Sequence, residues 1–455
     1  MRILIALLIT ACMALAQDTL QSRVVEYLTA MIRQDTSNPP GKETRTATFL
    51  KQTADRLGIP AELLGPDPNR LNFIARLKGS GANRPLLLIA HSDVVPADRS
   101  QWTVDPFAAL NKNGVLYGRG AVDDKSLLAA ELAVLAEIKK RNIKLNRDII
   151  LLSEADEEAG SSGIIWLIKN AFAKIDAEYA LNEGGSALNT PGGMRVCQVQ
   201  TVEKIPTRVK LIAKGTAGHG SRPLPDNPVV HLARAITRLA DAEQPVRLNT
   251  TTRRYLAQMA TLPDYQWLKP LLPKLEDSKT SAAAANEINE KKSEMGAMLR
   301  TTVSPTMLEA GMKVNIIPNT AEAQVDVRRL PNETKEEVLE RFKNIINDPA
   351  ITIDSGFGQQ MPATEPSSLT TALYKAMEKV LSKSAPKAML VPYVSLGASD
   401  GAFLREKGMA VYGVPVFYKE AERLAHGNDE RISIKNLQQG TEALLQIVLE
   451  VATEK

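Results

Sequence analysis

The 455-residue sequence is poor in the side chains on which several protein classes depend. Its two cysteines are too few for a cysteine-ligated zinc finger or a small disulfide-stabilised fold. Aromatic residues make up 4% of the chain, too few for a surface that stacks nucleic-acid bases. The 56 lysines and arginines exceed the 52 acids by only four, and no dense basic block occurs. We therefore expect no nucleic-acid partner.

The rest of the composition is that of a folded globular protein. Hydrophobic residues make up 44% and charged residues 24% of the sequence. At roughly 150 residues per domain the length corresponds to about three domain-equivalents, so we expect two large domains. Beyond the N-terminus no stretch reaches the ~18 apolar residues that a membrane-spanning helix needs, so no membrane span is predicted.

Residues 1–16 are predicted to be a secretory signal peptide. Arg2 precedes an apolar run from Ile3 to Ala16, and Ala14-Leu15-Ala16 fits a small-x-small cleavage site. An alternative stays open, because residues 9–12 resemble a bacterial lipoprotein box that would leave Cys12 lipidated at the new N-terminus. We expect a secreted or periplasmic protein. Cleavage after Ala16 leaves Cys197 as the one cysteine, so no internal disulfide is expected.

Short apolar runs alternate with helical periodicity in the first and last parts of the chain. The runs at 85–90, 148–153 and 177–182 are typical of strands buried on both faces of a parallel sheet. Helices are expected between them, at 126–140 and 161–173, and the pattern resumes at 367–382, 409–415 and 435–452. This order predicts an α/β sheet sandwiched by helices, formed by residues 17–203 and 359–455.

The pattern changes between residues 204 and 358. Leaving out the largely helical segment 249–300, the expected order of elements is β-α-β-β-α-β, which is a ferredoxin-like unit. The strands are expected at 208–213, 303–315, 321–329 and 351–354, and the helices at 227–242 and 333–347. We therefore expect residues 204–358 to form a smaller domain inserted into the α/β domain.

Histidine and acidic residues follow directly on the predicted strands. His91 and Asp93 follow the first of these strands, residues 154–158 contain four acids after the second, and Glu183 follows the third. Ligands of open α/β sheets bind beyond the carboxyl ends of the strands. Carboxylates that converge there repel one another unless a cation compensates them, and zinc accepts both histidine and carboxylate ligands. Positions i and i+2 share a face, so Asp93 is placed to orient His91.

Ten stretches of the sequence resemble, in order, the motifs of one enzyme family. They are AHSDVVPAD (90–98), WTVDPF (102–107), YGRGAVDDKS (117–126), ADEEAGSSG (155–163), NEGG (182–185), GTAGHGSRP (215–223), VNIIPN (314–319), DVRRLP (326–331), GASDGAFLR (397–405) and AHGNDERI (425–432). The family is that of the dinuclear zinc peptidases and amidohydrolases, which includes aminoacylase, carnosinase, carboxypeptidase G and carboxypeptidase S. The first three stretches and the 249–300 segment are most similar to the carboxypeptidase S branch.

The resemblance implies two Zn²⁺ ions per subunit, for which Co²⁺ or Mn²⁺ can substitute. By position in the motifs, His91 binds one ion and Asp123 bridges both. Glu158 and His426 complete the ligands of one ion, and Glu183 completes those of the other.

The resemblance also implies the catalytic groups. Glu157 is the general base that accepts a proton from the water activated by the two ions, and Asp93 supports the metal ligand His91. His219, in the inserted domain, polarises the scissile carbonyl, often from the partner subunit of a homodimer.

Four further residues are expected to contact the substrate. Arg328 and Asn315 are implied to hold its carboxylate, while Gly397 and Ser399 line the pocket. For Arg328 a purely structural salt bridge with Asp326 remains an alternative.

The expected activity is hydrolysis of an amide next to a free carboxylate. Two substrate classes stay open: short peptides, as for a carboxypeptidase or dipeptidase, and N-acyl amino acids, as for an aminoacylase. A non-catalytic binding protein on the same fold is the alternative from another class, but Glu157 and all five ligands are present. We expect a homodimer through residues 204–358, unless the 249–300 segment covers the sheet edge or lets His219 act within one chain.

Overall fold

The computed structural model describes residues 18–358, 360–384, 388–420 and 425–454. The predicted signal peptide and Cys12 lie outside the described residues. None of the helices in the described ranges has both the length and the apolar character needed to cross a membrane.

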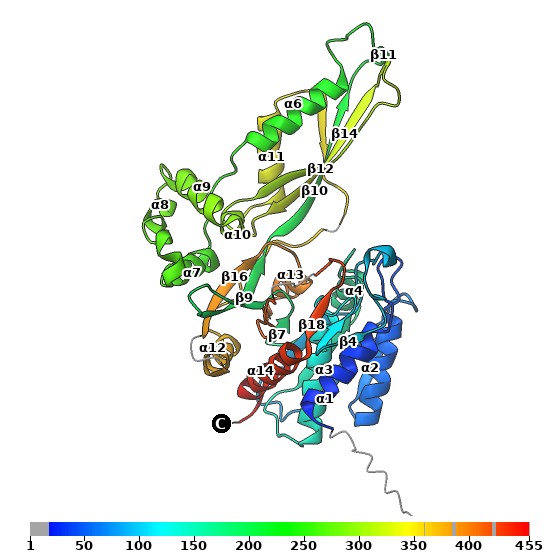
Figure 1. The fold of residues 1–455 in the computed structure, drawn as a ribbon, viewed down its shortest axis with the longest axis vertical. Coiled ribbons are helices and arrows are strands. Elements are labelled where there is room, and N and C mark those ends of the chain that lie inside the picture. The colour runs from blue at the N-terminus through cyan, green and yellow to red at the C-terminus, as the bar shows by residue number, and fades with distance from the viewer. Residues whose placement is uncertain (1–17, 359, 385–387, 421–424, 455) are drawn as a thin grey trace, which may run out of the picture.

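A nine-stranded mixed sheet forms the centre of the larger part of the molecule (Figure 1). Its order is β1 (Ala61–Leu64), β2 (Asn72–Leu77), β6 (Ile149–Glu154), β3 (Leu86–His91), β7 (Tyr179–Asn182), β17 (Ala410–Gly413), β9 (Arg195–Glu203) and β16 (Ala388–Ser395), with β8 (Ser186–Asn189) beside β9. Strands β6, β3, β7 and β17 are mutually parallel, so their carboxyl ends meet at one edge of the sheet.

Helices cover both faces of this sheet. Along β3, Leu86 and Leu88 pack into one hydrophobic cluster and Leu87 and Ile89 into another, because successive side chains of a strand point to opposite faces. The first cluster includes α1 (Leu20–Ile32), α2 (Thr44–Leu57), α3 (Lys125–Lys140), α12 (Ala372–Ser384) and α14 (Ile434–Ala452). The second includes α4 (Ser162–Asn170), α5 (Phe172–Ile175) and α13 (Gly401–Glu406). The predicted α/β/α sandwich is confirmed.

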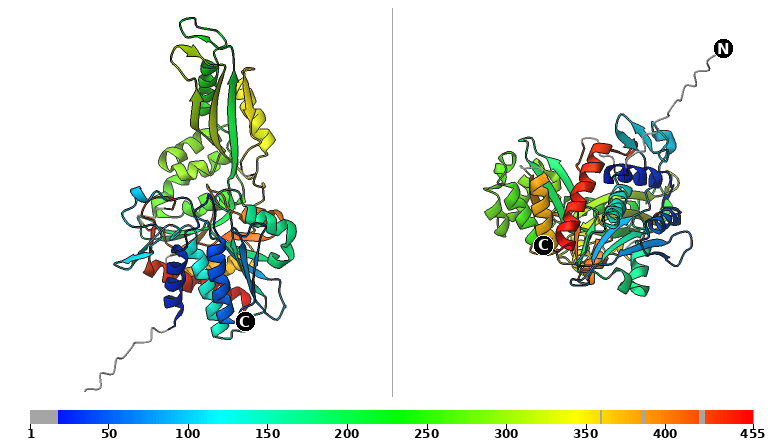
Figure 2. Two further views of the ribbon diagram at one scale, coloured as in Figure 1. Left: turned by 90° about the vertical axis from the view of Figure 1, so that its right-hand side faces the viewer. Right: turned by 90° about the horizontal axis from the view of Figure 1, so that it is seen from below.

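A second, antiparallel sheet stands away from these layers and is here called the lid (Figures 1 and 2). Its order is β12 (Thr302–Ala310), β14 (Thr320–Arg329), β10 (Ile205–Lys214) and β15 (Ile351–Asp354). Helices α6 (Pro228–Asp241) and α11 (Lys335–Ile346) share its hydrophobic core. Numbered along the chain, the strand order is 2-3-1-4, so the ferredoxin-like prediction is confirmed.

Two smaller sheets complete the fold. Strands β11 (Gly218–His219) and β13 (Ile316–Ile317) pair at the tip of the lid that is farthest from the sandwich (Figure 1). Strands β4 (Leu110–Lys112), β5 (Val115–Tyr117) and β18 (Arg431–Ser433) form a three-stranded sheet beside the sandwich, where a short turn η1 (Arg99–Gln101) also lies.

The helical segment between the second and third lid elements packs on the sandwich. It consists of α7 (Thr250–Met259), η2 (Pro263–Leu268), α8 (Leu272–Glu276), α9 (Ser281–Lys291) and α10 (Ser293–Ala297). Leu256 and Ile288 of this segment share a buried cluster with Val196 of β9 and Val391 of β16. Among the described residues these helices therefore leave the outer lid strand β12 uncovered, and residues 304–310 of that strand are exposed.

Candidate active site

The parallel strands bring together the residues that follow them. His91 ends β3 in register with Glu154 at the end of β6, and Glu183 follows β7 directly. The expectation that these side chains gather at the carboxyl edge of the sheet therefore matches the structure.

Asp123 lies between two imidazoles at this edge. One of its carboxylate oxygens is 3.0 Å from Nε2 of His91, and the other is 3.2 Å from Nε2 of His426. His426 Nε2 is also 3.1 Å from Glu158 Oε1. A carboxylate that presents each oxygen to a different imidazole has the geometry of a bridging ligand.

The cluster fits divalent cations. Ligand atoms of His91, Asp123 and Glu158 lie within 4.8 Å of one another, as do those of His91, Asp124 and Glu183. Nδ1 of His91 lies 3.0 Å from the backbone carbonyl of Asp93, to which it donates. Since a neutral imidazole carries one proton, Nε2 keeps the lone pair that a metal requires. The sequence did not single out Asp124, and its buried oxygen Oδ2 has no hydrogen-bond partner in the described part of the chain.

The electrostatics of the cluster also favour the binding of cations. Burial raises the pKa of Glu183 to about 8 and raises the pKa of Glu157 well above its usual value, with further repulsion between these two carboxylates. Burial acts in the same direction on Asp123, but its hydrogen bonds with His426 and His91 outweigh this and lower its pKa. Cations bound among these groups would relieve the repulsion and keep the carboxylates ionised.

The carboxylate of Asp93 positions the loop that carries the paired glutamates. It accepts hydrogen bonds from the backbone N–H groups of Glu157 (3.2 Å) and Glu158 (3.1 Å). Its Oδ1 lies 3.5 Å from Nδ1 of His91, farther than the carbonyl of the same residue. Asp93 thus orients His91 mainly through its main chain and orients the loop of Glu157 and Glu158 through its side chain.

Three residues that support this loop were missed by the sequence analysis. Asp156 has a φ of +72°, a left-handed conformation that turns the chain just before Glu157. Asn38 Nδ2 donates to Asp156 (2.9 Å) and to Asp93 (2.7 Å), and Arg70 donates to Asp156 (2.8 Å). Asn38 and Arg70 lie far from the glutamates in the sequence and carry no motif, so only the folded chain reveals them.

Glu430, also missed, holds the loop that carries Asp123. Its fully buried carboxylate accepts hydrogen bonds from the backbone N–H groups of Gly120 (3.1 Å), Val122 (2.7 Å) and Asp123 (3.0 Å), and from Nη1 of Arg119 (2.7 Å). Arg119 also donates to the backbone carbonyl of His426 (3.3 Å). Glu430 and Arg119 therefore fix two expected metal ligands that lie about 300 residues apart in the chain.

We expect Glu430→Gln to weaken zinc binding by roughly 10–100-fold, as loss of a residue that orients ligands does. The NH₂ group of glutamine would face the backbone N–H groups or Arg119, which are all donors, so hydrogen bonds to the loop would be lost. Breaking the buried ion pair between Glu430 and Arg119 should also cost about 3–5 kcal/mol of stability. Competitive titration with a zinc chelator measures the affinity. Glu333→Gln is the control, because Glu333 is buried in the lid, where it pairs with Arg341 (2.9 Å). This variant should lose stability but keep the wild-type zinc affinity. Unchanged zinc affinity in Glu430→Gln would contradict this role.

The lid residues do not join the cluster within this chain. His219 lies exposed on β11, and Asn315 is beside it, its backbone carbonyl accepting from Gly220 (2.8 Å). Arg328 lies near the opposite end of the ten-residue strand β14, which spans roughly 30 Å. Arg328 donates from Nε to Asp326 (3.1 Å), so the salt bridge exists, but its Nη groups have no hydrogen-bond partner among the described residues.

The hydrogen bonds of His219 fix its tautomer. The backbone N–H of Ser221 donates to Nδ1 of His219 at 3.2 Å. Because a backbone N–H can only donate, Nδ1 carries the lone pair and Nε2 carries the proton in the neutral ring. His219 therefore presents a hydrogen-bond donor to solvent, as stabilisation of an oxyanion requires.

A cavity of about 340 Å³ adjoins the cluster. Asp123, Asp124, Glu183 and Gly397 are among the residues that line it, whereas Ser399 is not. Its other walls are mixed: apolar side chains such as Leu127, Leu396 and Phe417 lie beside polar and charged ones, which include Gln198, Ser395, Glu294 and Lys419. Ser399 is buried nearby, where its hydroxyl accepts from Gln200 (3.2 Å).

Imidazoles and carboxylates gathered at the strand ends of an α/β/α sandwich, with a separate lid, define a class of metal-dependent hydrolases. The chain belongs to peptidase family M20/M25/M40, whose sequence model matches residues 87–450. The family expected from the motifs is thus confirmed.

Individual relatives resemble most of the chain. Human N-fatty-acyl-amino acid synthase/hydrolase PM20D1 is 27% identical over 382 residues, which cover 82% of this chain and 75% of that protein. A Dictyostelium discoideum protein described as "Probable carboxypeptidase S-like 2" is 26% identical over 369 residues, which cover 78% of this chain and 69% of that protein. The M20 family metallo-carboxypeptidase Sso-CP2 from Sulfolobus solfataricus has the same fold, with a TM-score of 0.73 at 24% identity, covering 94% and 98% of the two chains.

Proposed function

We propose that this protein is a two-metal amide hydrolase that acts next to a free carboxylate. The observation that carries the proposal is Asp123, whose two oxygens face His91 and His426 separately. His91, Asp123 and Glu183 would hold one ion, and Asp123, Glu158 and His426 the other. Zn²⁺ suits this set of ligands, and Co²⁺ or Mn²⁺ can replace it.

The chain's own residues would perform the proton transfers and the positioning. When bound, the ions supply the positive charge that acidifies a water molecule and polarises the scissile carbonyl. Glu157, anchored through its backbone to Asp93, would accept the proton of the attacking water and pass it to the leaving amine. The Nη groups of Arg328 would bind the substrate carboxylate through a bidentate pair.

The exposed edge of the lid supports a homodimer that completes the site. Strand β12 has no partner on its outer side among the described strands, and large apolar side chains are exposed along it and beyond it. They are Met307, Leu308, Met312, Val314 and Ile316. An open apolar edge of this kind favours pairing with another chain. A partner's lid could then bring its His219 and Asn315 to a cluster that they do not reach within one chain.

Between the two substrate classes we favour N-acyl amino acids with an apolar acyl group. The mixed walls of the cavity beside Asp123 and Glu183 include apolar side chains, such as Leu127, Leu396 and Phe417, that would contact such a group. Similarity to the N-fatty-acyl-amino acid hydrolase supports the same choice. Dipeptides are the second candidate, supported by the similarity to carboxypeptidases.

We expect the purified protein to contain about two zinc ions per chain and to lose all turnover on chelation. Elemental analysis measures the metal, and activity should return when zinc is added back. Parallel panels of N-acyl amino acids and dipeptides, each with and without chelator, would measure the substrate preference. An active, metal-free preparation would refute the proposal, and faster turnover of dipeptides would establish the second candidate.

A further inference from the structure

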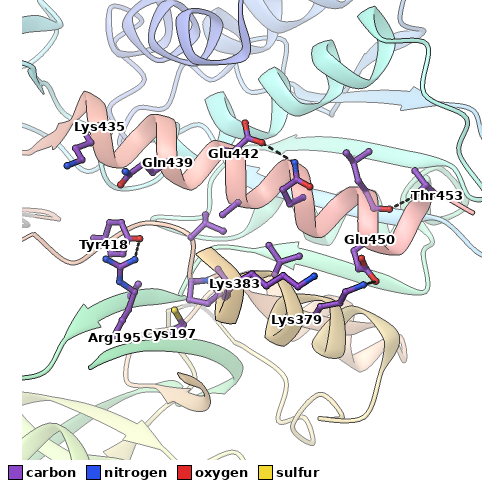
Figure 3. Close-up of a pocket in the computed structure, with 18 residues that line it drawn as sticks. Arg195, Cys197, Lys379, Lys383, Tyr418, Lys435, Gln439, Glu442, Glu450 and Thr453 are labelled. Atoms are coloured by element: carbon purple, nitrogen blue, oxygen red, sulfur yellow. Dashed lines mark hydrogen bonds and ion pairs between the residues drawn. The ribbon is translucent and has the colours of Figure 1, made fainter. Parts of the chain in front are cut away.

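A large groove lies in the sandwich, away from the metal-ligand cluster (Figure 3). Its volume is about 840 Å³, within the range of small-molecule sites. Helices α12 and α14 form its sides, and residues of β8, β9 and the segment 415–418 complete it. None of the described residues lines both this groove and the cavity beside the cluster.

The groove and the cavity lie on opposite faces of the same strands. Ala187 faces the groove, whereas its neighbours Ser186 and Leu188 face the cavity. In the adjoining segment Tyr418 lines the groove, whereas Phe417 lines the cavity. This alternation follows from the two-residue period of extended chain, so a ligand in the groove would not contact the expected metal ligands.

The two ends of the groove differ in charge. Figure 3 shows Lys435, Arg195 and Tyr418 at one end and Lys379 and Glu450 at the other. Lys379 is neutralised by its ion pair with Glu450 (2.7 Å). Arg195 stacks 4.0 Å from the Tyr418 ring centroid and hydrogen-bonds its hydroxyl, and neither Arg195 nor Lys435 has a carboxylate partner among the described residues. Positive charge is therefore uncompensated at the Lys435 end.

The groove has both apolar and polar walls. Val380, Val416, Ala443 and Leu449 contribute apolar surface. The polar lining includes Glu442 and Gln446, which are hydrogen-bonded to each other. Cys197 adds a thiol, but burial raises its pKa to about 11, so at neutral pH it is a protonated, weakly polar group. A ligand with a long apolar body and one anionic end would match the apolar part of these walls and the positive charge at the Lys435 end.

We propose that this groove is a second binding site for a long-chain carboxylate, such as a fatty acid. The hydrocarbon chain would lie between α12 and α14, and the carboxylate would pair with Lys435 and Arg195. Binding needs neither turnover nor metal, so it can be tested separately from the proposed hydrolysis.

The probe is dodecanoate, measured by isothermal titration calorimetry on the whole mature protein below its micelle concentration. We expect one saturable site per chain. Lys435→Glu should weaken binding by about tenfold or more, because it reverses a charge at the carboxylate. Ala443→Trp should abolish binding by filling the groove. Dodecyltrimethylammonium, with the same chain and opposite charge, should bind at least about tenfold more weakly.

Lys375→Glu is the matched control, since Lys375 is exposed on α12 and does not line the groove. Dodecanoate should bind this variant as it binds the wild type. Lys435 lies in the first turn of α14, where a glutamate suits the helix dipole, so Lys435→Glu should fold normally. No saturable binding, or unchanged binding in both Lys435→Glu and Ala443→Trp, would overturn the proposal. So would binding to anionic vesicles without binding to dissolved dodecanoate.

Discussion

Glu157→Gln should leave both metal ions in place and reduce kcat by at least about 10²-fold. Glutamine has nearly the same shape, and its backbone N–H can still donate to Asp93, so the loop should keep its conformation. The amide cannot accept the proton of the attacking water or return it to the leaving amine. Elemental analysis and steady-state kinetics on the same preparation measure the two effects.

The neighbouring residue supplies the control for that experiment. Glu158 contacts His426 (3.1 Å) and belongs to a group that can hold a metal, so Glu158→Ala should lower metal content. Two adjacent glutamates would then give opposite results, one keeping the metal without turnover and the other losing it. If the Glu157→Gln variant kept more than about a tenth of the wild-type rate, Glu157 would not be the general base.

The location of the site could be predicted because it depends on the ends of strands. Apolar runs such as residues 85–90 locate a buried strand, and parallel pairing then brings His91 and Glu183 to one edge. The lid topology could also be predicted, since β14 alternates in burial throughout its length and β15 does the same. Both predictions rest on short-range patterns.

Other features depend on contacts between distant residues and leave no local pattern. Strand β9 was missed because polar residues interrupt its apolar ones, yet it is almost entirely buried. Two of its polar side chains hydrogen-bond to residues far along the chain: Gln198 donates to Tyr255 (3.1 Å) and Gln200 to Ser399 (3.2 Å). Glu430 likewise lies about 300 residues from the loop that it holds.

Mixed dimers of two inactive variants should recover activity if His219 acts across the subunit interface. His219→Ala removes the hydrogen-bond donor that would polarise the carbonyl and should reduce kcat by about 10²–10³-fold. Glu157→Gln removes the general base. In a mixed dimer, the first chain's intact Glu157 meets the second chain's intact His219, while the other site carries both defects. Random exchange at equal amounts makes half of the dimers mixed, each with one working site, so about a quarter of the wild-type rate should return.

A third variant separates assembly from chemistry in that experiment. Leu308 is 69% exposed on the open edge strand β12, so Leu308→Asp should disfavour pairing of lids without disturbing the sandwich. Introduced into both inactive chains, it should prevent recovery while each chain keeps its metal. Light scattering measures the oligomeric state in parallel. His219 is exposed at the lid tip, away from the cluster, so a fully active monomer would require the lid to fold back within one chain. That result, or no recovery despite proven subunit exchange, would refute the shared site.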